Sequence, residues 1–563
     1  MARVLATPGV YIDEKSAFPN SAVPVPTAVP VFIGYTEKAI MGKKSLLKVP
    51  TKISSYGEFL EFFGGPPKVK YTIEADAAVG YKLTADKSTQ FILHSCMKLF
   101  FSNGGSDCYI VSVGKYTDAP TGVVGADLTS GIEPLLKEPE PTMVVIPEAI
   151  LLVEESTAKG PDPNDNTKQI DIVTRDAQGA FDLQVAMLAH CGLDMRNRVA
   201  ILDVPLGNLD LREDVVKNFR VGIGQNFLQW GGAYYPFLET AIVAAEELDF
   251  SNIVNITGDD ITADAPDFAD KLDDKQKLIA AANKAAFETD TTAIEVSSLA
   301  TLLYKNLREE LSESLISGKR AVEIHEQIVK LDTFKTGIPD AKADEATQLH
   351  QTLLAVSPTY KELMKNLRSS MNLLPPSPAM AGIYSMVDNT VGVHQSPANI
   401  SVGSVIKPAV DLTAKDQEDL NLPLNGKAIN AIRTFPGKGV LVWGARTLDG
   451  NSQDWRYISV RRTVIFIEQS IKFAAEAYVF EPNVSSTWSN IRALISNFLT
   501  NVWKSGALAG ATPDDAFSVD VGLGTTMTPI DILDGIMRIS VRIAVTRPAE
   551  FIVITFQQKM QTS

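Results

Sequence analysis

The sequence predicts a multidomain protein of mixed α+β and α/β class. Its 563 residues exceed what one hydrophobic core organises, and a domain size of roughly 150 residues gives about three or four domains. Apolar residues recur at helical spacing in some segments and alternate at strand spacing in others. The composition, with 45% hydrophobic and 21% charged residues, is ordinary for a folded water-soluble chain.

Charge and cysteine content exclude several classes of protein. A net charge of −15 argues against a nucleic-acid partner, because phosphate contacts need a basic surface. Three cysteines (Cys96, Cys108 and Cys191) are too few and uneven for a disulfide scaffold and fit a reducing cytosol. The first residues lack the apolar run of a signal peptide, and no window reaches about 18 apolar residues. We therefore expect assembly in the cytoplasm and no membrane insertion.

Residues 1–37 are predicted to form an N-terminal arm and the first strands of a domain. Val10 and Ile12 fall on one face of a short strand, and Tyr11 falls on the other. Four prolines between residues 19 and 30 then favour a stiff, extended segment. Val31–Tyr35 is a compact apolar strand.

Residues 38–259 are predicted to be an inserted α/β domain. Apolar spacing and glycine stop signals predict its helices and strands. Residues 154–169 are rich in acidic residues, proline and asparagine, so we interpret them as a polar surface loop. The elements expected are helices at Ser54–Phe63, Phe91–Phe101 and Phe181–Cys191 and strands at Cys108–Val113 and Arg198–Pro205.

Residues 260–374 change in character and are predicted to be a helical insertion. They are rich in alanine, leucine, glutamate and lysine with apolar residues three or four apart. Charges are intermixed along the whole stretch, which is typical of a solvated surface decoration. The insertion is expected to end at the prolines from Pro375 to Pro378.

Residues 375–563 are predicted to close the fold with a compact C-terminal module. Helices are expected over Arg461–Val479, which Pro482 would end, and over Trp488–Lys504. Residues Gly535–Val545 alternate apolar and polar side chains and predict a strand with one buried face. A last strand is expected over Glu550–Gln557.

The two chain ends are predicted to join neighbouring subunits. Both carry short strands on segments that can extend, and an extended strand can add to the edge of another subunit's sheet. The residues expected in these inter-subunit strands are Val10, Tyr11, Ile12, Phe551, Ile552, Val553 and Ile554.

Basic residues of the C-terminal module are candidates for docking on an acidic partner. The apolar stripe of Trp488–Lys504 is typical of core packing, but Arg492 and Lys504 are the charges of its polar face. Arg461 and Arg462 open the preceding helix as a basic pair.

The sequence predicts no catalytic, cofactor or metal site. His94 with Cys96 and His190 with Cys191 are close pairs, but neither has a second pair at zinc-finger spacing, so we interpret them as core residues. His325 and Glu326 lack the second histidine of a zinc protease. Neither a phosphate-binding loop nor a Gly-x-Ser-x-Gly nucleophile motif is present.

A series of short motifs resembles the sheath proteins of contractile phage tails and contractile injection systems. The motifs occur in the family's order across residues 8–37, 91–113 and 375–556, whereas residues 260–370 match no pattern of that family. The residues that carry the resemblance are Pro8–Glu14, Phe100–Gly105, Cys108–Val111, Pro375–Ser377, Ala381–Tyr384, Pro397–Asn399, Asn430–Arg433, Trp443–Leu448, Arg461–Arg462, Phe480–Asn483, Trp503–Leu508 and Pro548–Phe551.

The resemblance implies an architecture and a set of partners. The N-terminal segment and residues 375–563 would form one inner domain, with the middle of the chain inserted into it and facing outward. Subunits would stack as hexameric rings into a helical homopolymer around an inner tube protein, with baseplate and terminal cap proteins at its ends. Contraction would drive the tube through a target envelope without nucleotide hydrolysis. Arg461, Arg462, Arg492 and Lys504 would then be candidates for contact with the tube.

Two other classes stay open at this stage. One is an enzyme or ligand-binding protein that uses the α/β region, which requires a pocket with convergent polar groups. The other is a structural tube that does not contract and so lacks a second, shorter lattice.

Overall fold

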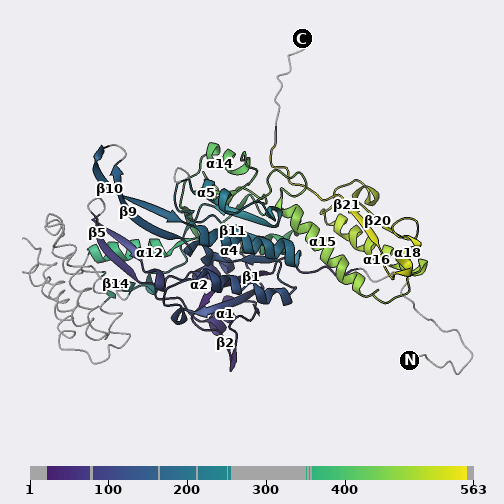
Figure 1. The fold of residues 1–563 in the computed structure, drawn as a ribbon, viewed down its shortest axis with the longest axis horizontal. Coiled ribbons are helices and arrows are strands. Elements are labelled where there is room, and N and C mark those ends of the chain that lie inside the picture. The colour runs from purple at the N-terminus through teal and green to yellow at the C-terminus, as the bar shows by residue number, and fades with distance from the viewer. Residues whose placement is uncertain are drawn as a thin grey trace, which may run out of the picture. The chain divides into compact units, whose positions relative to one another are not determined.

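The computed structural model describes residues 22–76, 80–162, 165–210, 214–249, 252–254, 350–351, 354 and 358–553. The chain divides into two compact units, each continuous in space but not in sequence. The larger unit comprises Ala28–Met386 and Pro397–Ser452. The smaller unit comprises Met1–Thr27, Val387–Ser396 and Gln453–Ser563. Figure 1 shows the elements of both.

A nine-stranded sheet forms the core of the larger unit. Its six central strands are parallel and lie in the order β7-β1-β8-β11-β12-β18, while β4 on one side and β19 on the other run antiparallel to their neighbours, with β16 outermost. The central strands are almost continuously apolar, as expected for a sheet covered on both faces. The strands are β1 (Pro30–Thr36), β4 (Thr51–Ile53), β7 (Cys108–Lys115), β8 (Met143–Val145), β11 (Val199–Asp203), β12 (Gly231–Tyr235), β16 (Ile400–Ser401), β18 (Asn430–Phe435) and β19 (Gly439–Val442).

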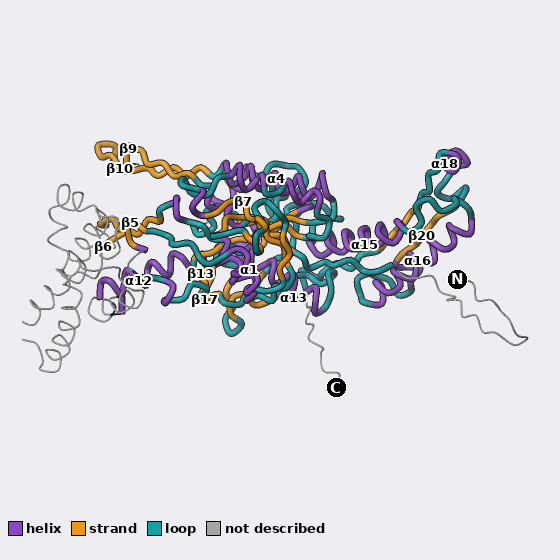
Figure 2. The backbone as a smooth tube through the Cα atoms, turned by 90° about the horizontal axis from the view of Figure 1, so that it is seen from below, coloured by secondary structure: helices purple, strands orange, loops and turns teal. Residues whose placement is uncertain are grey.

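Helices cover both faces of this sheet. In Figure 2, α4 lies on one side of β7, and α1 and α13 lie on the other. Helix α3 packs on α4, and α4 packs on α5, whereas α1 packs on α2. The helices are α1 (Tyr56–Phe63), α2 (Leu93–Ser102), α3 (Gly125–Ser130), α4 (Gln178–Ala189), α5 (Val215–Gly222), α12 (Pro358–Met371), α13 (Ser377–Thr390) and α14 (Ala414–Asn421).

Smaller sheets extend from this core. Strands β5 and β6 pair with β14, β13 pairs with β15 and β17, and β2 pairs with β3. Strands β9 and β10 form a long hairpin that projects from the unit in Figures 1 and 2. These strands are β2 (Ile40–Met41), β3 (Lys44–Ser45), β5 (Tyr71–Asp76), β6 (Gly80–Ala85), β9 (Glu154–Asp162), β10 (Asp165–Asp176), β13 (Leu238–Thr240), β14 (Ile253–Val254), β15 (Leu373–Leu374) and β17 (Val405–Pro408).

The hairpin corrects the prediction of a loop at residues 154–169. Side chains 154–159 are exposed on both faces of β9, so this part of the strand has no buried face. Backbone pairing with β10 holds it instead. A search for apolar periodicity cannot find such a strand.

The domain boundaries also differ from those predicted. Strand β1 lies in the middle of the nine-stranded sheet, and β18 and β19 belong to the same sheet. Residues 28–37 and 397–452 therefore belong to the larger unit and not to an inner domain shared with the C-terminus. The predicted helical insertion at 260–374 lies outside the described residues up to α12, apart from residues 350–351 and 354.

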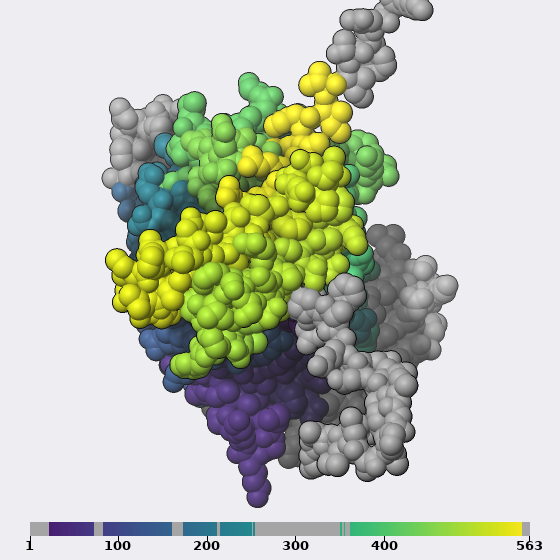
Figure 3. Space-filling view, turned by 90° about the vertical axis from the view of Figure 1, so that its right-hand side faces the viewer, coloured from purple at the N-terminus to yellow at the C-terminus, as the bar shows by residue number. Residues whose placement is uncertain are grey.

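The smaller unit packs two long helices against a two-stranded sheet. Its core is apolar and draws on both helices and the sheet, including Ile467, Ile495, Phe498 and Val519. The surface of this unit, in lime to yellow, faces the viewer in Figure 3. Its elements are α15 (Ile458–Glu476), α16 (Ser485–Lys504), α17 (Pro513–Ala516), β20 (Phe517–Val521), α18 (Pro529–Leu533) and β21 (Ile539–Ile543).

The predicted positions of α15 and of the strand around β21 agree closely with the structure. Helix α15 begins three residues before the predicted start and ends at Glu476, six residues before Pro482. In and around β21, Met537, Ile539, Val541, Ile543 and Val545 pack on the core as their alternation predicted.

The close crossing of α2 and α13 generates a testable prediction. A Cβ atom at Gly382 would lie 2.5 Å from the carbonyl oxygen of Phe100, which is part of the α2 backbone. We expect Gly382→Ala to lower the free energy of unfolding by about 1–3 kcal/mol through overpacking. Gly57→Ala in α1 is the control, because its Cβ meets only Ser55 Oγ at 3.8 Å and alanine favours a helix. Equal urea midpoints for the two variants would contradict the prediction.

Candidate functional site

The smaller unit has a strand with an open edge. Among the described residues, β21 pairs with β20 alone in an antiparallel ladder. Next to the ladder, the N–H of Ala544 donates to the carbonyl of Ala516 (2.9 Å), and its carbonyl accepts from Ala509 N–H (2.7 Å). Backbone groups alternate in direction along a strand. Those of Val541 and Ile543 therefore point away from β20, toward the open edge.

The outer edge of β20 has a side-chain contact at its end. The Arg492 guanidinium on α16 donates a hydrogen bond of 2.8 Å to the carbonyl oxygen of Val521. This contact gives Arg492, a predicted tube-contact residue, an intramolecular role as well. Its side chain and that of Lys504 are exposed, so both stay candidates for contact with a partner.

A groove of about 620 Å³ runs beside β21. One wall comes from a single face of α15. The other comes from β21 together with Val545 and Arg547, which follow it. The walls are apolar and the rim is charged, which suits an extended segment that buries alternate side chains while its backbone pairs with β21. The lining residues are Asp454, Trp455, Val460, Val464, Ile467, Glu468, Ile471, Lys472, Val541, Ile543, Val545 and Arg547.

Helix α15 also anchors the N-terminal segment. Ala22 is part of the core of the unit. Val25 N–H donates to Ser470 Oγ (3.2 Å), and the carbonyl of Thr27 accepts from Arg462 Nη2 (2.9 Å). The segment thus runs antiparallel along α15. The predicted strand residues Val10, Tyr11 and Ile12 precede it and lie outside the described residues.

A buried ion pair fixes the start of α15. Arg462 Nη2 lies 2.5 Å from Asp388 Oδ2, and the two side chains are only 4% and 1% exposed. A second bond joins Arg462 Nη1 to Asp388 Oδ1 at 3.0 Å. The pair connects α15 to the end of α13, and Arg462 also holds Thr27.

The burial of the basic pair corrects its predicted role. Arg461 is 6% exposed, and its guanidinium lies 4.5 Å from the centre of the Trp455 ring. Burial lowers the pKa of Arg461 to about 10. Because Arg461 and Arg462 are both buried inside the unit, they stabilise its own packing and offer no surface to an inner tube.

The C-terminal segment is anchored near the same end of α15. Arg547 Nη2 lies 3.5 Å from Asp454 Oδ1, and Tyr457 Oη donates to Glu550 Oε2 at 3.2 Å. Phe551, Ile552 and Val553 then leave the surface and are 66%, 78% and 89% exposed. They are not in a strand, so this part of the predicted strand Glu550–Gln557 does not form within the single chain. Ile554 lies outside the described residues.

Sequence reasoning missed the residues that hold these segments. Asp388, Ser470 and Tyr457 contact partners far away in the chain, and none belongs to a periodic pattern or a known motif. The only feature of the sequence that could have indicated them is a polar side chain within or next to an apolar helix.

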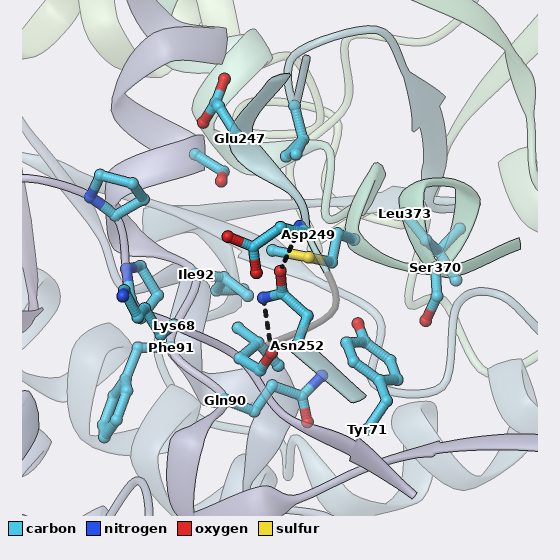
Figure 4. Close-up of a pocket in the computed structure, with 16 residues that line it drawn as sticks. Lys68, Tyr71, Gln90, Phe91, Ile92, Glu247, Asp249, Asn252, Ser370 and Leu373 are labelled. Atoms are coloured by element: carbon cyan, nitrogen blue, oxygen red, sulfur yellow. Dashed lines mark hydrogen bonds between the residues drawn. The ribbon is translucent and has the colours of Figure 1, made fainter. Parts of the chain in front are cut away.

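The larger unit contains a cavity relevant to the ligand-binding alternative (Figure 4). Its volume is about 270 Å³. Polar groups on its wall bond to other parts of the chain: Asn252 Nδ2 donates to the carbonyl of Val69 (2.9 Å), and Asn252 Oδ1 accepts from Asp249 N–H (3.0 Å). Burial raises the pKa of Tyr71, and a hydrogen bond to Ser370 opposes that rise. These contacts join the segments that form the wall.

The paired histidines and cysteines are core residues, as predicted. His94 and His190 are 2% exposed, and burial lowers the pKa of each to about 4. Cys96 and Cys191 are fully buried. Within the described part of the chain, no cluster of three or more His, Cys, Asp or Glu side chains has the geometry to hold a metal ion. Nor does that part include a helix with the length and apolar character needed to cross a bilayer.

The segment that contains the groove matches a known domain. Residues 451–559 fit the family described as the phage tail sheath C-terminal domain. This segment resembles a tail sheath domain. The resemblance predicted from the motifs is therefore confirmed. Over 269 residues the chain is 25% identical to the tail sheath protein of Vibrio phage KVP40, covering 45% of this chain and 39% of that protein. The matched region thus spans about two fifths of that relative.

Solved structures share the sheath fold over almost the whole chain. One is from the anti-feeding prophage baseplate, with 23% identity, a TM-score of 0.53 and coverage of 99% of this chain and 100% of that chain. Another is from the sheath complex of an extracellular contractile injection system, PVC, in its contracted state. It also has 23% identity and a TM-score of 0.53, with 99% of each chain covered. The mixed α/β architecture of this chain is that of contractile sheath proteins.

The buried ion pair of Arg462 and Asp388 should dominate the electrostatic stability of the smaller unit. We expect Asp388→Asn to lower the free energy of unfolding by about 3–5 kcal/mol, because Arg462 is left buried without its counter-charge. Asp454→Asn is the control, since its exposed pair with Arg547 is worth less than about 1 kcal/mol. Urea unfolding of the unassembled chain measures both. Similar small losses in the two variants would contradict the expectation.

Proposed function

We propose that this chain is the structural subunit of a contractile sheath. The observation that carries the proposal is the open edge of β21 beside an apolar groove, in a segment that matches the tail sheath C-terminal domain. An unpaired strand edge favours association with another chain. The groove walls and the edge together favour an extended strand as the partner.

The strands that fill the groove come from the arms of other subunits. Phe551, Ile552 and Val553 are an exposed apolar segment that needs cover, and Val10, Tyr11 and Ile12 form the corresponding segment at the N-terminus. Both arms are rooted on α15 by the contacts of Thr27 and Glu550. Each subunit thus presents a docking edge and two arms.

Repetition of these links builds hexameric rings that stack around an inner tube. Contraction is a rearrangement of rigid units connected by the arms, and its free energy comes from improved subunit contacts. The exposed Arg492 and Lys504 are the proposed contacts with the tube protein. Baseplate and cap proteins bind the ends of the polymer, which assembles in the producing cell's cytoplasm as part of a phage tail or injection-system particle. The subunit itself is not an enzyme.

A chain that ends after Glu550 tests the role of the C-terminal arm. It keeps the contact between Tyr457 and Glu550 but loses Phe551 and all that follows. We expect a folded, unassembled protein, because Phe551, Ile552 and Val553 are largely exposed and their loss removes little packing. A chain that ends after Gln557 is the control and should polymerise. Electron microscopy distinguishes the two, and tubes of normal length from the shorter chain would contradict the model.

Val541→Pro tests the docking edge. Proline removes an N–H that points away from β20, so the ladder with β20 keeps its hydrogen bonds while an incoming strand loses one. We expect a folded domain and loss of tubes. Val541→Thr, which keeps the N–H, should still assemble. Normal tubes from Val541→Pro, seen by electron microscopy and with an unchanged circular dichroism spectrum, would exclude strand addition at β21.

A further inference from the structure

The larger unit has the strand order of a ligand-binding α/β fold. In chain order, its first five parallel strands are β1, β7, β8, β11 and β12, and they lie in the sheet as β7-β1-β8-β11-β12. This is the order 2-1-3-4-5. Such sheets bind ligands outside the carboxyl ends of the strands, where the strand order reverses. That position here lies between β1 and β8.

A side chain of the protein itself occupies the position. Glu148 follows β8 and is fully buried. Its Oε2 accepts from Tyr35 N–H (2.9 Å) near the carboxyl end of β1. Its Oε1 accepts from the N–H groups of Ile92 (3.1 Å) and Leu93 (3.3 Å) at the start of α2. Two of these donors are the helix-terminal groups that bind phosphates and carboxylates in other α/β proteins.

The adjoining backbone is shaped around the carboxylate. A Cβ atom at Gly34 would lie 2.8 Å from Glu148 Oε2, so glycine leaves the room that the carboxylate fills. In ligand-binding sheets a glycine at this place lets the ligand approach the backbone. Here it lets an internal side chain approach.

The next strand repeats the arrangement. Asp203 ends β11 and is 2% exposed. Its Oδ1 accepts from Ser377 N–H (2.7 Å), and its Oδ2 accepts from the Ser377 hydroxyl (2.5 Å). Ser377 is the first residue of α13. The N-termini of α2 and α13, at the carboxyl edge of the sheet, thus each donate hydrogen bonds to a buried carboxylate.

We propose that Glu148 is an internal anion that takes the place of a ligand, and that its removal exposes a binding site for a small carboxylate. Three convergent N–H donors match the acceptor positions of one carboxylate group. Burial raises the pKa of Glu148 to about 7, and the N–H donors oppose that rise. The experiments below are therefore done at pH 8, where the carboxyl group of wild-type Glu148 is mostly ionised. The inference does not depend on the proposed sheath function.

Chemical rescue of Glu148→Ala tests the proposal. The thermal unfolding midpoint of the full unassembled chain is measured in sodium formate and in sodium chloride of equal ionic strength. We expect a lower midpoint than wild type in chloride and a rise of several degrees in formate for Glu148→Ala alone. No rise, or an equal rise in wild type, would overturn the proposal and leave Glu148 as an ordinary hydrogen-bonded core residue.

A second variant separates binding at the site from general salt effects. Glu148→Gln keeps the side-chain volume and should be destabilised. Its amide has one accepting oxygen, so either the N–H of Tyr35 or the N–H groups of Ile92 and Leu93 lose their acceptor. Since it fills the site, formate should not raise its midpoint, and a rise equal to that of Glu148→Ala would overturn the proposal. If Glu148→Ala does not fold in chloride, refolding in formate should yield soluble protein. Failure in both salts, with Glu148→Gln folded, would equally overturn it.

Discussion

The buried pair of Arg462 and Asp388 is the interaction on which the smaller unit depends. It joins α15 to the end of α13, and the same guanidinium holds the carbonyl of Thr27. A buried pair is not in itself a large source of stability, because desolvation opposes the attraction between its charges. It does penalise every arrangement that separates the partners. The root of the N-terminal arm is therefore held in one place on α15.

The two edges of the β20–β21 sheet have different environments. Arg492 donates a hydrogen bond to Val521 at the outer edge of β20, whereas the edge of β21 opens onto the apolar groove. Proteins usually protect strand edges because exposed edges associate. The open edge of β21 therefore favours association on one side of the sheet.

The larger unit has an α/β sheet in which a buried side chain lies at the reversal of the strand order. Its strand order places a binding position between β1 and β8, and Glu148 fills that position from within. Fold similarity to ligand-binding sheets therefore says little about activity here, because function depends on the side chains at the site.

The sequence by itself determined the two long helices and one strand of the smaller unit, because their apolar spacing is local. Helix α16 and the alternation from Met537 to Val545 lie close to their predicted positions. The short motifs also predicted the resemblance that residues 451–559 show to the tail sheath C-terminal domain. Only the tertiary structure decided which charges are available to a partner. The sequence predicted Arg462 as a surface cation. In the structure it is buried and paired with Asp388, 74 positions away in the chain. The tertiary structure also decided that residues 154–162 form a strand and that β1 belongs with β18 and β19. Each of these features depends on residues distant in the chain, and the local apolar periodicity of a segment does not identify such residues.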